Sequence, residues 1–273
     1  IGQGFVGKNI ADDFENRGHK IVRYAKEKKY LLGRLKIKYA DIVFIAVPTP
    51  TTPEGFDASI VDEVLSLVGK GKTAVIKSTI LPGTTEELQK KHPGIFVLHS
   101  PEFLREKRAA EDVAKPSRNI VGIPVDTQEY RAKASAVHAV LPEAPYTATM
   151  LAKESELVKY VANCFLYTKV VFANLAYELA GAVGANWDKV RAGVVADPRI
   201  GESHFTVSDG GRGAGGHCFI KDFAAFSTLY DDLVKDPRGA ALLKAFEEKN
   251  NTLLRQSGKD LDLLDGVYGA QKK

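Results

Sequence analysis

A cysteine in the last quarter of the chain follows its most glycine-rich stretch. Five glycines lie in the segment from Gly210 to Gly216, just before Cys218. A loop without side chains lets the backbone close around a ligand, and the N–H groups at the beginning of a helix favour a thiolate. Lys221 adds a positive charge nearby. We predict that Cys218 is a nucleophile, whereas Cys164, within an apolar helical stretch, is typical of a buried and inert cysteine.

Two polar side chains interrupt that apolar stretch. Lys159 and Asn163 are four residues apart, which places both on one face of a helix. A buried lysine is costly unless it has a partner or a function. Two such donors can stabilise a developing oxyanion, and the alternative is a pair that faces solvent.

The first residues carry a glycine pattern typical of phosphate binding. Gly2, Gly4 and Gly7 fit the spacing that turns the backbone tightly and directs a helix N-terminus at a pyrophosphate. Phe5 and Val6 belong to the same turn, so we count them among the cofactor-binding residues. The pattern predicts a dinucleotide site, and an ordinary glycine-rich turn is the alternative.

The end of the expected second strand departs from the usual dinucleotide pattern. An acidic residue there normally binds the adenosine ribose, but this chain has Ala25, followed by Glu27 and by Lys26, Lys28 and Lys29. Such a basic cluster can meet a 2′-phosphate, or it can be a solvated run of charges. We predict NAD as the cofactor, with NADP as an option.

Short apolar runs alternate with amphipathic stretches in the first half of the chain. Strands are expected at residues 19–24, 41–47, 73–77, 95–98 and 119–123, and helices at residues 6–17, 59–69, 84–91 and 132–141. This alternation predicts an α/β fold with a Rossmann-like, doubly wound parallel sheet. It would form an NAD-binding domain over residues 1–145.

The pattern changes near residues 142–149. Residues 150–183 form one long helical pattern with almost no purely polar face, which predicts a buried helix between lobes or subunits. Further helices are expected at residues 186–195, 221–234 and 238–256, with the glycine loop at 209–216 and a frayed tail at 271–273. Residues 146–273 would thus form an all-helical dimerisation and substrate domain built on the long helix and carrying the cysteine loop.

The composition is that of an ordinary globular protein. The chain has 273 residues, of which 44% are hydrophobic and 26% charged, with a formal charge of +4. The longest apolar runs fall far short of the roughly 20 residues that span a bilayer. Two cysteines without CxxC spacing argue against a zinc site and against a disulfide framework. We expect a cytoplasmic protein without a metal, and with neither a nucleic acid nor a membrane as partner.

Seven sequence stretches occur together in one order. They are the glycine turn at residues 2–7, Val47-Pro-Thr-Pro50 with Gly55 and Asp57, Lys77 to Thr85, Ser100 to Glu106, Lys159 to Asn163, Asp197 to Gly201 and Gly215 to Asp222. In these stretches the chain resembles the UDP-glucose/GDP-mannose dehydrogenase family. The stretch at 100–106 is more similar to the UDP-glucose and GDP-mannose members than to the members that act on N-acetylated sugars.

The resemblance implies a four-electron oxidation of a sugar C6 alcohol to a carboxylate by two NAD+ in succession, with UDP-glucose as the implied substrate. Cys218 would form a thiohemiacetal and then a thioester, which water hydrolyses. Lys159 and Asn163 would stabilise the oxyanions. By matching positions, Asp222 and Thr79 would hold or activate the water.

The same resemblance implies further site residues. Glu106 would handle protons in the hydrolytic step, with Glu102 alongside; the alternative is two carboxylates on a solvated turn. The implied substrate-binding residues are Glu102, Phe103, Leu104, Arg199, Gly215 and Lys221. The implied cofactor-binding residues are Gly2, Gly4, Phe5, Val6, Gly7, Val47, Pro48, Thr49, Thr79 and Glu106. Arg199 matches an arginine that reaches the substrate of a neighbouring subunit, which implies a homodimer; a structural role in a turn is the alternative.

Several positions depart from the family pattern. Ala214 stands where an aromatic residue is usual, His217 where a small residue is usual, and Ile220 where a proline is usual. A surface position is the simpler expectation for His217. No counterpart of the family's C-terminal domain, which binds the uridine diphosphate, follows Lys273, so we expect a fragment or a short form, with residues missing before Ile1.

Two other functions compete with this interpretation. A β-hydroxyacid dehydrogenase of the 6-phosphogluconate type shares the Rossmann lobe, the long helix and a Lys-x-x-x-Asn pair but performs one two-electron step, and Cys218 in its glycine loop argues against it. A non-catalytic binding remnant of the fold would dimerise without turnover. Because no nominated catalytic residue is missing, we favour the enzyme.

Overall fold

The computed structural model describes residues 1–52, 55–208 and 210–269, with only the backbone described for Thr52 and Glu106. The chain divides into two compact units. Unit 1 comprises Ile1–Pro50 and Asp57–Lys159, and unit 2 comprises Thr51–Phe56 and Tyr160–Lys273. This division differs from the expected boundary after residue 145, because a further strand and the first turns of the long helix pack with unit 1.

Unit 1 contains a five-stranded sheet in the order β1-β4-β5-β6-β7. The strands are β1 (Ile42–Ile45), β4 (Thr73–Ile76), β5 (Phe96–His99), β6 (Arg118–Ile123) and β7 (Tyr146–Leu151). All neighbouring pairs are parallel except β5 and β6, which meet antiparallel where His99 pairs with Gly122. The predicted α/β class is confirmed, with a mixed rather than wholly parallel sheet.

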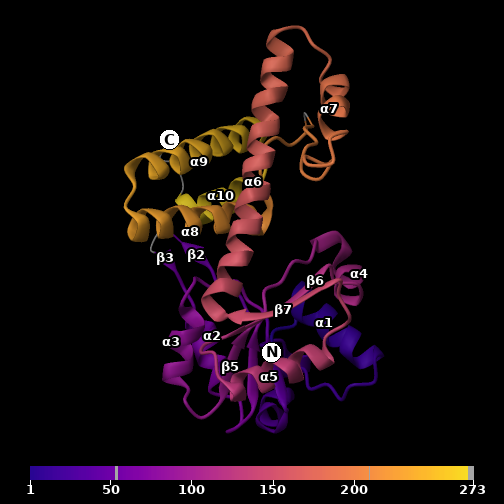
Figure 1. Ribbon diagram of the computed structural model, residues 1–273, viewed down its shortest axis with the longest axis vertical. Coiled ribbons are helices and arrows are strands. Elements are labelled where there is room, and N and C mark those ends of the chain that lie inside the picture. The colour runs from indigo at the N-terminus through magenta and orange to yellow at the C-terminus, as the bar shows by residue number, and fades with distance from the viewer. Residues whose placement is uncertain (53–54, 209, 270–273) are drawn as a thin grey trace. The chain divides into compact units, whose positions relative to one another are not determined.

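Helices cover the sheet of unit 1 (Figure 1). They are α1 (Phe5–Asn16), α2 (Ser59–Leu65), α3 (Thr84–Lys91), α4 (Ala109–Ala114) and α5 (Gln128–Val140), with two 3-10 segments, η1 (Lys28–Tyr39) and η2 (Glu106–Arg108). Phe44 of β1 packs against Phe14 of α1, and Val75 of β4 belongs to one cluster with Val137 of α5. On β5, the backbone N–H of Val97 donates to Gln89 of α3 at 2.8 Å.

One expected strand of unit 1 does not form, and one observed strand was not expected. Residues 19–24 form no regular strand, although the chain runs beside the sheet: the Gly2 N–H donates to the Tyr24 carbonyl and the Ala46 N–H to the Ile1 carbonyl, both at 2.9 Å. In contrast, β7 was not expected, because its side chains are mostly exposed or half-buried, so it lacks the apolar run of a buried strand.

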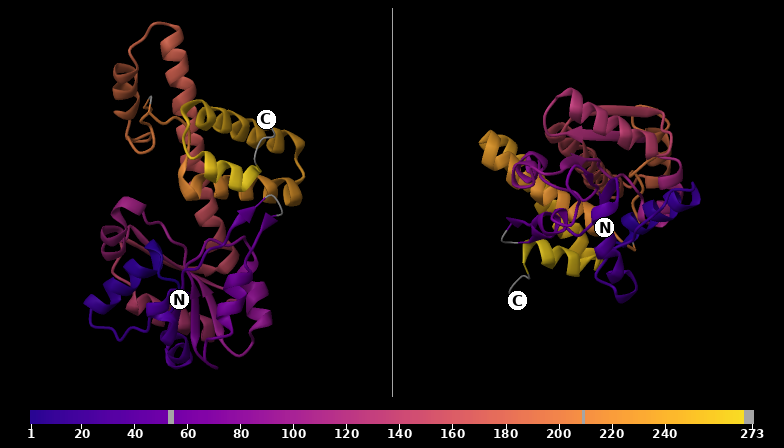
Figure 2. Two further views of the ribbon diagram at one scale, coloured as in Figure 1. Left: turned by 180° about the vertical axis from the view of Figure 1, so that it is seen from behind. Right: turned by 90° about the horizontal axis from the view of Figure 1, so that it is seen from below.

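Unit 2 is built from helices and one small hairpin. The long helix α6 (Ala152–Ala182) begins in unit 1, and α7 (Trp187–Val195), α8 (Gly216–Val234), α9 (Pro237–Ser257) and α10 (Leu261–Tyr268) follow it. Helices α8, α9 and α10 pack against one another (Figure 1). The hairpin of β2 (Thr51–Thr52) and β3 (Gly55–Phe56) lies beside α8 and α10, as the view from behind shows (Figure 2). The hairpin, α4 and α10 were not expected.

Helix α6 is buried on one face only. Tyr160, Cys164 and Tyr167 are buried, and Cys164 belongs to a core cluster with Phe223 of α8. A second face carries exposed apolar side chains at spacings of four, seven and seven residues, namely Val161 (50% exposed), Phe165 (68%), Phe172 (56%) and Leu179 (65%). Within one chain this second face is not covered, so the expectation of a helix buried between lobes or subunits stays a prediction for this face. Among the described residues, no helix is long and apolar enough to cross a membrane.

A buried carboxylate of α6 caps another helix of unit 1. Glu156 accepts hydrogen bonds from the backbone N–H groups of Gly83 (2.7 Å) and Thr85 (2.9 Å) and from the Thr85 hydroxyl (2.5 Å), at the beginning of α3. These bonds satisfy donors that the helix itself cannot. Burial nevertheless raises the pKa of Glu156 to about 7. Protonation of this one group therefore depends on whether the chain is folded.

We predict that this carboxyl makes the stability of the fold depend on pH. A carboxyl whose pKa rises on folding binds its proton more tightly in the folded state, so the free energy of unfolding falls as the pH rises from about 4.5 to about 7. Glu156→Gln removes the titrating group and should flatten the profile over this range. Urea denaturation at several pH values measures it. Glu87→Gln, at an exposed position of α3, serves as the control, and parallel profiles of wild type and Glu156→Gln would contradict the prediction.

Candidate active site

The three glycines of the N-terminal turn occupy three different environments. A Cβ on Gly2 would lie 2.1 Å from the Ala46 carbonyl oxygen, and one on Gly7 would lie 2.1 Å from the Gly2 carbonyl oxygen. Gly2 also has a φ of 82°. These two positions are glycine because the turn, β1 and α1 approach closely. A Cβ on Gly4 would meet no atom within 4 Å, so open space lies above the helix start.

That open space is suited to a phosphate group. Gly4 is the N-cap of α1 and no side chain caps the helix, so the N–H groups of its first turn, which includes Phe5 and Val6, are available to a ligand. The three environments match the roles of a dinucleotide fingerprint: a tight turn, close approach to a pyrophosphate, and close packing of helix on strand. The residues present therefore fit the pyrophosphate of NAD.

Two further predicted cofactor segments are linked at the carboxyl edge of the sheet. The Val47 N–H donates to the Ser78 hydroxyl at 3.0 Å, and the Thr49 hydroxyl donates to the Thr79 carbonyl at 2.7 Å. Thr49 is buried and Pro48 is exposed. These segments follow β1 and β4, and ligands of open α/β sheets bind at this edge. The structure thus brings Val47, Thr49 and Thr79 together.

A second group of predicted residues meets in unit 1. The Glu102 carboxylate lies 3.9 Å from the Lys159 ammonium, and both side chains are at least nine-tenths buried. The Lys159 ammonium lies 5.8 Å from the centre of the Phe103 ring, over which the Arg118 guanidinium stacks at 3.7 Å. The Glu102 carboxylate also accepts a hydrogen bond from the Leu104 N–H. The Glu102–Lys159 pair and the Phe103 ring therefore lie close together. The Glu106 side chain lies outside the described residues.

Sequence reasoning missed two further polar groups of this cluster. Lys77 donates to the Ser100 hydroxyl and to the Pro101 carbonyl, each at 3.1 Å, and burial of its ammonium lowers the pKa of Lys77 to about 8. His99 is fully buried, and burial together with the neighbouring lysines lowers its pKa to about 3, so the ring is neutral. The position of both residues at the carboxyl ends of buried strands was the available signal, since such ends line ligand sites.

Cys218 lies in the first turn of α8, which begins five residues earlier than expected. Gly215 is the N-cap, and it has no side chain of its own to cap the helix. The thiol is exposed, in contrast to that of buried Cys164, whose pKa is raised by burial. The helix N-terminus favours the anionic form of a sulfur placed there. His217, the preceding residue, is exposed as expected.

Asp222 follows Cys218 by one helical turn and is the polar centre of unit 2. The Asn163 amide donates to its carboxylate at 2.6 Å, and the Lys221 ammonium lies 3.6 Å from the other carboxylate oxygen. Asp222 is only 1% exposed. A buried carboxylate needs such partners, and its position on α8 aligns it with Cys218 at the spacing that puts side chains on one helix face. The structure thus brings Asn163, Lys221 and Asp222 together.

Polar side chains of α9 and of the residues that follow it hold the glycine loop. The Asn250 amide accepts from the Ala214 N–H at 2.7 Å and donates to the Ala214 carbonyl at 3.1 Å. The Asp260 carboxylate accepts from the Gly216 N–H at 2.7 Å, and Lys259 donates to the Gly213 carbonyl at 2.9 Å. Sequence reasoning missed these residues, because nothing in a helical pattern marks the side chain that will meet a distant loop.

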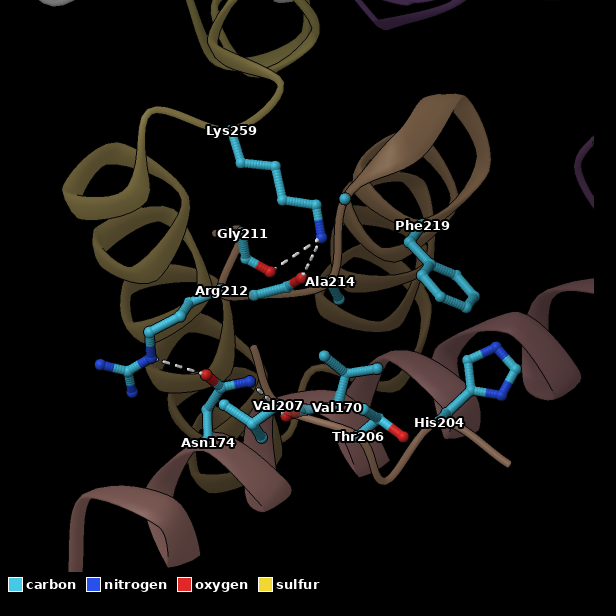
Figure 3. Close-up of a pocket in the computed structure, with 12 residues that line it drawn as sticks. Val170, Asn174, His204, Thr206, Val207, Gly211, Arg212, Ala214, Phe219 and Lys259 are labelled. Carbon is cyan, nitrogen blue, oxygen red and sulfur yellow. Dashed lines mark hydrogen bonds between the residues drawn. The ribbon is translucent and has the colours of Figure 1, made fainter. Parts of the chain in front are cut away.

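A cavity of about 240 Å³ lies beside this loop (Figure 3). Gly215, a predicted substrate-binding residue, lines it together with Val170, Asn174, His204, Thr206, Val207, Gly211, Arg212, Gly213, Ala214, Phe219 and Lys259. Figure 3 shows Lys259 directed at the loop carbonyls and Arg212 turned toward Asn174, to which it donates at 2.9 Å. The Arg212 guanidinium also forms an ion pair with Glu178 at 2.7 Å, whereas Lys259 brings a positive charge to a lining of mixed polar and apolar residues.

Arg199 projects into solvent. Its side chain is 87% exposed and forms an ion pair with Asp197, two residues before it, at 2.6 Å. This carboxylate raises the pKa of Arg199. The predicted residues thus fall into groups within each unit, and Arg199 stands apart from the group around Asp222. Within residues 1–52, 55–208 and 210–269, no cluster of three or more His, Cys, Asp or Glu side chains could hold a metal ion.

Family models match most of the chain. The model described as UDP-glucose/GDP-mannose dehydrogenase family, NAD binding domain, matches residues 29–141, and the model of the central domain of the same family matches residues 153–252. The UDP-glucose 6-dehydrogenase of Rickettsia prowazekii is 37% identical over 281 residues, which cover 96% of this chain and 62% of that protein. The chain therefore spans less than two thirds of the length of such relatives.

Solved structures show the same fold. A UDP-glucose dehydrogenase from the hyperthermophilic archaeon Pyrobaculum islandicum superposes with a TM-score of 0.79 and 29% identity, over 92% of this chain and 67% of that one. The 3-hydroxyisobutyrate dehydrogenase of Mycobacterium tuberculosis superposes with a TM-score of 0.72 over 98% of this chain and 96% of that one, but at 16% identity this likeness concerns the fold alone.

We predict that Asn250 is required for a stable glycine loop. Asn250→Ala leaves the Ala214 N–H and carbonyl buried without partners, which should lower the free energy of unfolding by about 2–4 kcal/mol. Asn251→Ala, the same change at the next position of α9, where the amide oxygen has no hydrogen-bond partner, should cost less than about 0.5 kcal/mol. Chemical denaturation measures both, and equal small losses would contradict the role given to Asn250.

Proposed function

Since the chain belongs to the UDP-glucose/GDP-mannose dehydrogenase family, we propose that it oxidises the C6 alcohol of a nucleotide sugar to a carboxylate, with UDP-glucose as substrate and UDP-glucuronate as product. The observation that carries the proposal is the arrangement on α8: an exposed thiol in the first turn and, four residues on, a buried carboxylate bonded to Asn163. A two-electron dehydrogenase needs no such thiol.

The proposed cofactor is NAD. The turn at Gly2, Gly4 and Gly7 would hold the pyrophosphate at the start of α1, and the segments of Val47 to Thr49 and Thr79 would line the rest of the cofactor. When bound, NAD+ accepts a hydride from C6 of the sugar in each of the two oxidations. Ala25 is buried at the place of the usual ribose-binding acid, so NADP stays an option.

Cys218 would hold the substrate after the first oxidation. Its thiolate attacks the aldehyde carbon, a carbon–sulfur bond forms, and the carbonyl electron pair moves to oxygen as a hemithioacetal oxyanion. Donors from Lys159 and Asn163 would stabilise that charge. The second oxidation then leaves a thioester on Cys218, which explains why the reaction would not stop at the aldehyde.

Hydrolysis of the thioester would release the product. Water attacks the thioester carbon, the carbon–sulfur bond breaks, and the thiolate of Cys218 is restored. Asp222 and Thr79 would hold the water, and Glu106 would accept its proton, with Glu102 alongside. The hydrogen bond from Asn163 and the nearby ammonium of Lys221 hold the Asp222 carboxylate in place for such a role.

The proposed substrate site uses residues from both groups. Phe103 and Leu104, with Glu102, would contact the sugar, and Gly215 and Lys221 would contact the substrate near Cys218. Lys259 lines the cavity beside the glycine loop and offers a positive charge to an anionic portion of the substrate there, while Arg212 is paired with Glu178. Ala214, in place of an aromatic residue, contributes little volume to this wall.

A second copy of the chain is the proposed partner. The exposed apolar face of α6, defined by Val161, Phe165, Phe172 and Leu179, is suited to burial against an identical helix. Arg199 would reach the active site of that second copy, for which its 87% exposure leaves it available. A cytoplasmic location also stays a prediction, supported by two cysteines that form no disulfide with each other.

We predict that oxidation of UDP-glucose forms two NADH per sugar, and that Cys218→Ser abolishes net uronate formation while cofactor binding persists. Loss of the nucleophile should lower turnover by about three orders of magnitude or more. Cys164→Ala is the matched control and should retain activity, because its thiol is buried. NADH absorbance with quantification of the sugar product measures the ratio. One NADH per sugar would favour the β-hydroxyacid type of reaction, and no NADH with UDP-glucose or related nucleotide sugars would favour a non-catalytic remnant.

We also predict that the site is shared between two copies. Arg199→Ala should raise the KM for the nucleotide sugar at least about tenfold, because a charge-assisted contact is lost, while the mass in solution stays that of a dimer. The double change Phe165→Ser and Phe172→Ser should lower the mass to that of a monomer and raise the KM as well. Sedimentation and steady-state kinetics measure both properties. A monomeric wild type, or an unchanged KM in Arg199→Ala, would contradict the proposal of a shared site.

A further inference from the structure

The 3-10 segment η1 carries large apolar side chains on its outside. Leu32 is 80% exposed, Leu35 69% and Tyr39 70%, and Leu31 is 47% exposed. Apolar side chains of this size normally face a core when they occur so close together. An exposed group of them indicates a surface that binds something.

Three contacts fix which side of η1 faces outward. Ile37 is only 2% exposed and anchors the segment in unit 1. Gly33 approaches the backbone of Arg23 so closely that a Cβ there would lie 1.9 Å from the Arg23 carbonyl oxygen, and Gly69 approaches the Lys38 carbonyl in the same way, at 2.1 Å. The segment is therefore attached through its inner side, and the leucines cannot turn inward without breaking these contacts.

The same surface is strongly basic. Residues 26–39 contain one acid, Glu27, and six basic residues, all exposed: Lys26, Lys28, Lys29, Arg34, Lys36 and Lys38. In the part of the chain that the structure describes, none of the six forms a salt bridge, whereas Arg23 nearby is paired with Asp12 and Glu15. Lys29 and Lys38 lie over the rings of Tyr30 and Tyr39. We call Leu31, Leu32, Leu35 and Tyr39 with these six cations the η1 surface.

We propose that the η1 surface binds peripherally to a bilayer that contains anionic lipids. Leucine side chains enter the boundary between headgroups and acyl chains, while lysine and arginine extend along them to the phosphates. Each basic residue near an anionic surface adds to this attraction, and four to eight of them are typical of such sites. Exposed leucines alone or basic residues alone are not sufficient for such binding, and η1 has both on its outward side.

The leucines decide between a bilayer and a nucleic acid. A surface that binds single-stranded nucleic acid combines cations with aromatic rings on which bases stack, and duplex binding needs cations and polar groups that reach phosphates. Leu31, Leu32 and Leu35 serve neither purpose. The expectation that no membrane is a partner considered only spanning segments, and it could not foresee that the folded chain would expose these leucines. The proposal is independent of the proposed enzymatic activity.

Sedimentation with vesicles tests the proposal on the intact chain. The protein should sediment with vesicles of phosphatidylcholine and phosphatidylglycerol but not with phosphatidylcholine alone, and the binding should weaken as salt is added. Leu32→Ser with Leu35→Ser, and separately Lys36→Glu with Lys38→Glu, should each lower the partition coefficient at least about tenfold. All four positions are exposed, so the folded state should persist, which a thermal melt checks.

Matched changes elsewhere serve as controls. Leu233→Ser alters an apolar side chain that is 72% exposed, and Lys90→Glu reverses an exposed charge on α3; both should leave vesicle binding unchanged. Equal sedimentation with the two kinds of vesicle, or full binding by both η1 variants, overturns the proposal. So does a result in which the η1 variants lose binding to a DNA oligonucleotide while vesicle binding is absent, which would assign the surface to a nucleic acid instead.

Discussion

The glycine loop is held in place by side chains from other parts of unit 2. Ala214 is bonded through both its backbone groups to Asn250, and Gly216 donates to Asp260. Glycine has the largest backbone entropy of any residue, so this stretch would be poorly ordered if nothing held it. Since Gly216 begins α8, the bond to Asp260 fixes the helix start that presents Cys218. The position of the thiol therefore depends on hydrogen bonds from the C-terminal part of unit 2. A Cβ on Gly215 would lie 2.0 Å from the Asp260 carboxylate, so a substitution there would displace the side chain that holds Gly216.

Unit 1 gathers positive charge without a matching number of carboxylates. Lys77 and Lys159 both lie near Glu102, and their field together with burial keeps His99 neutral. Two ammonium groups beside one carboxylate leave a net positive charge where water is largely excluded. Such a site is costly to the folded state on its own, but it is favourable to an oxygen atom that becomes negative during a reaction. This net positive charge thus lowers the stability of the folded state at the place where the proposed chemistry would need a positive field.

The sequence predicts the regular parts of the fold well, because period and glycine spacing are local properties. Helix α3 has the bounds expected for residues 84–91, and four of the expected strands lie within a few residues of β1, β4, β5 and β6. The strand expected at residues 19–24 does not form and β7 was missed, because strand formation depends on a neighbouring strand as well as on the segment's own apolar run. At the site, the pairing of Asn163 with Asp222 and of Glu102 with Lys159 joins residues more than fifty positions apart, and Asn250 could not be found because a helical pattern does not reveal tertiary partners.

The earlier start of α8 changes how Cys218 and Asp222 are placed relative to each other. With a helix from residue 221, Cys218 would lie in a loop and Asp222 in the first turn, with no fixed relation between thiol and carboxylate. With the helix from Gly216, both lie on one helix at a spacing of four residues, and the carboxylate is held from the other side by Asn163 of α6. The turn into this helix passes through Gly216 at a φ of 81°, which another residue would reach only with strain. The same glycines that let the loop close thus also let the helix start soon enough to set the thiol one turn before its carboxylate.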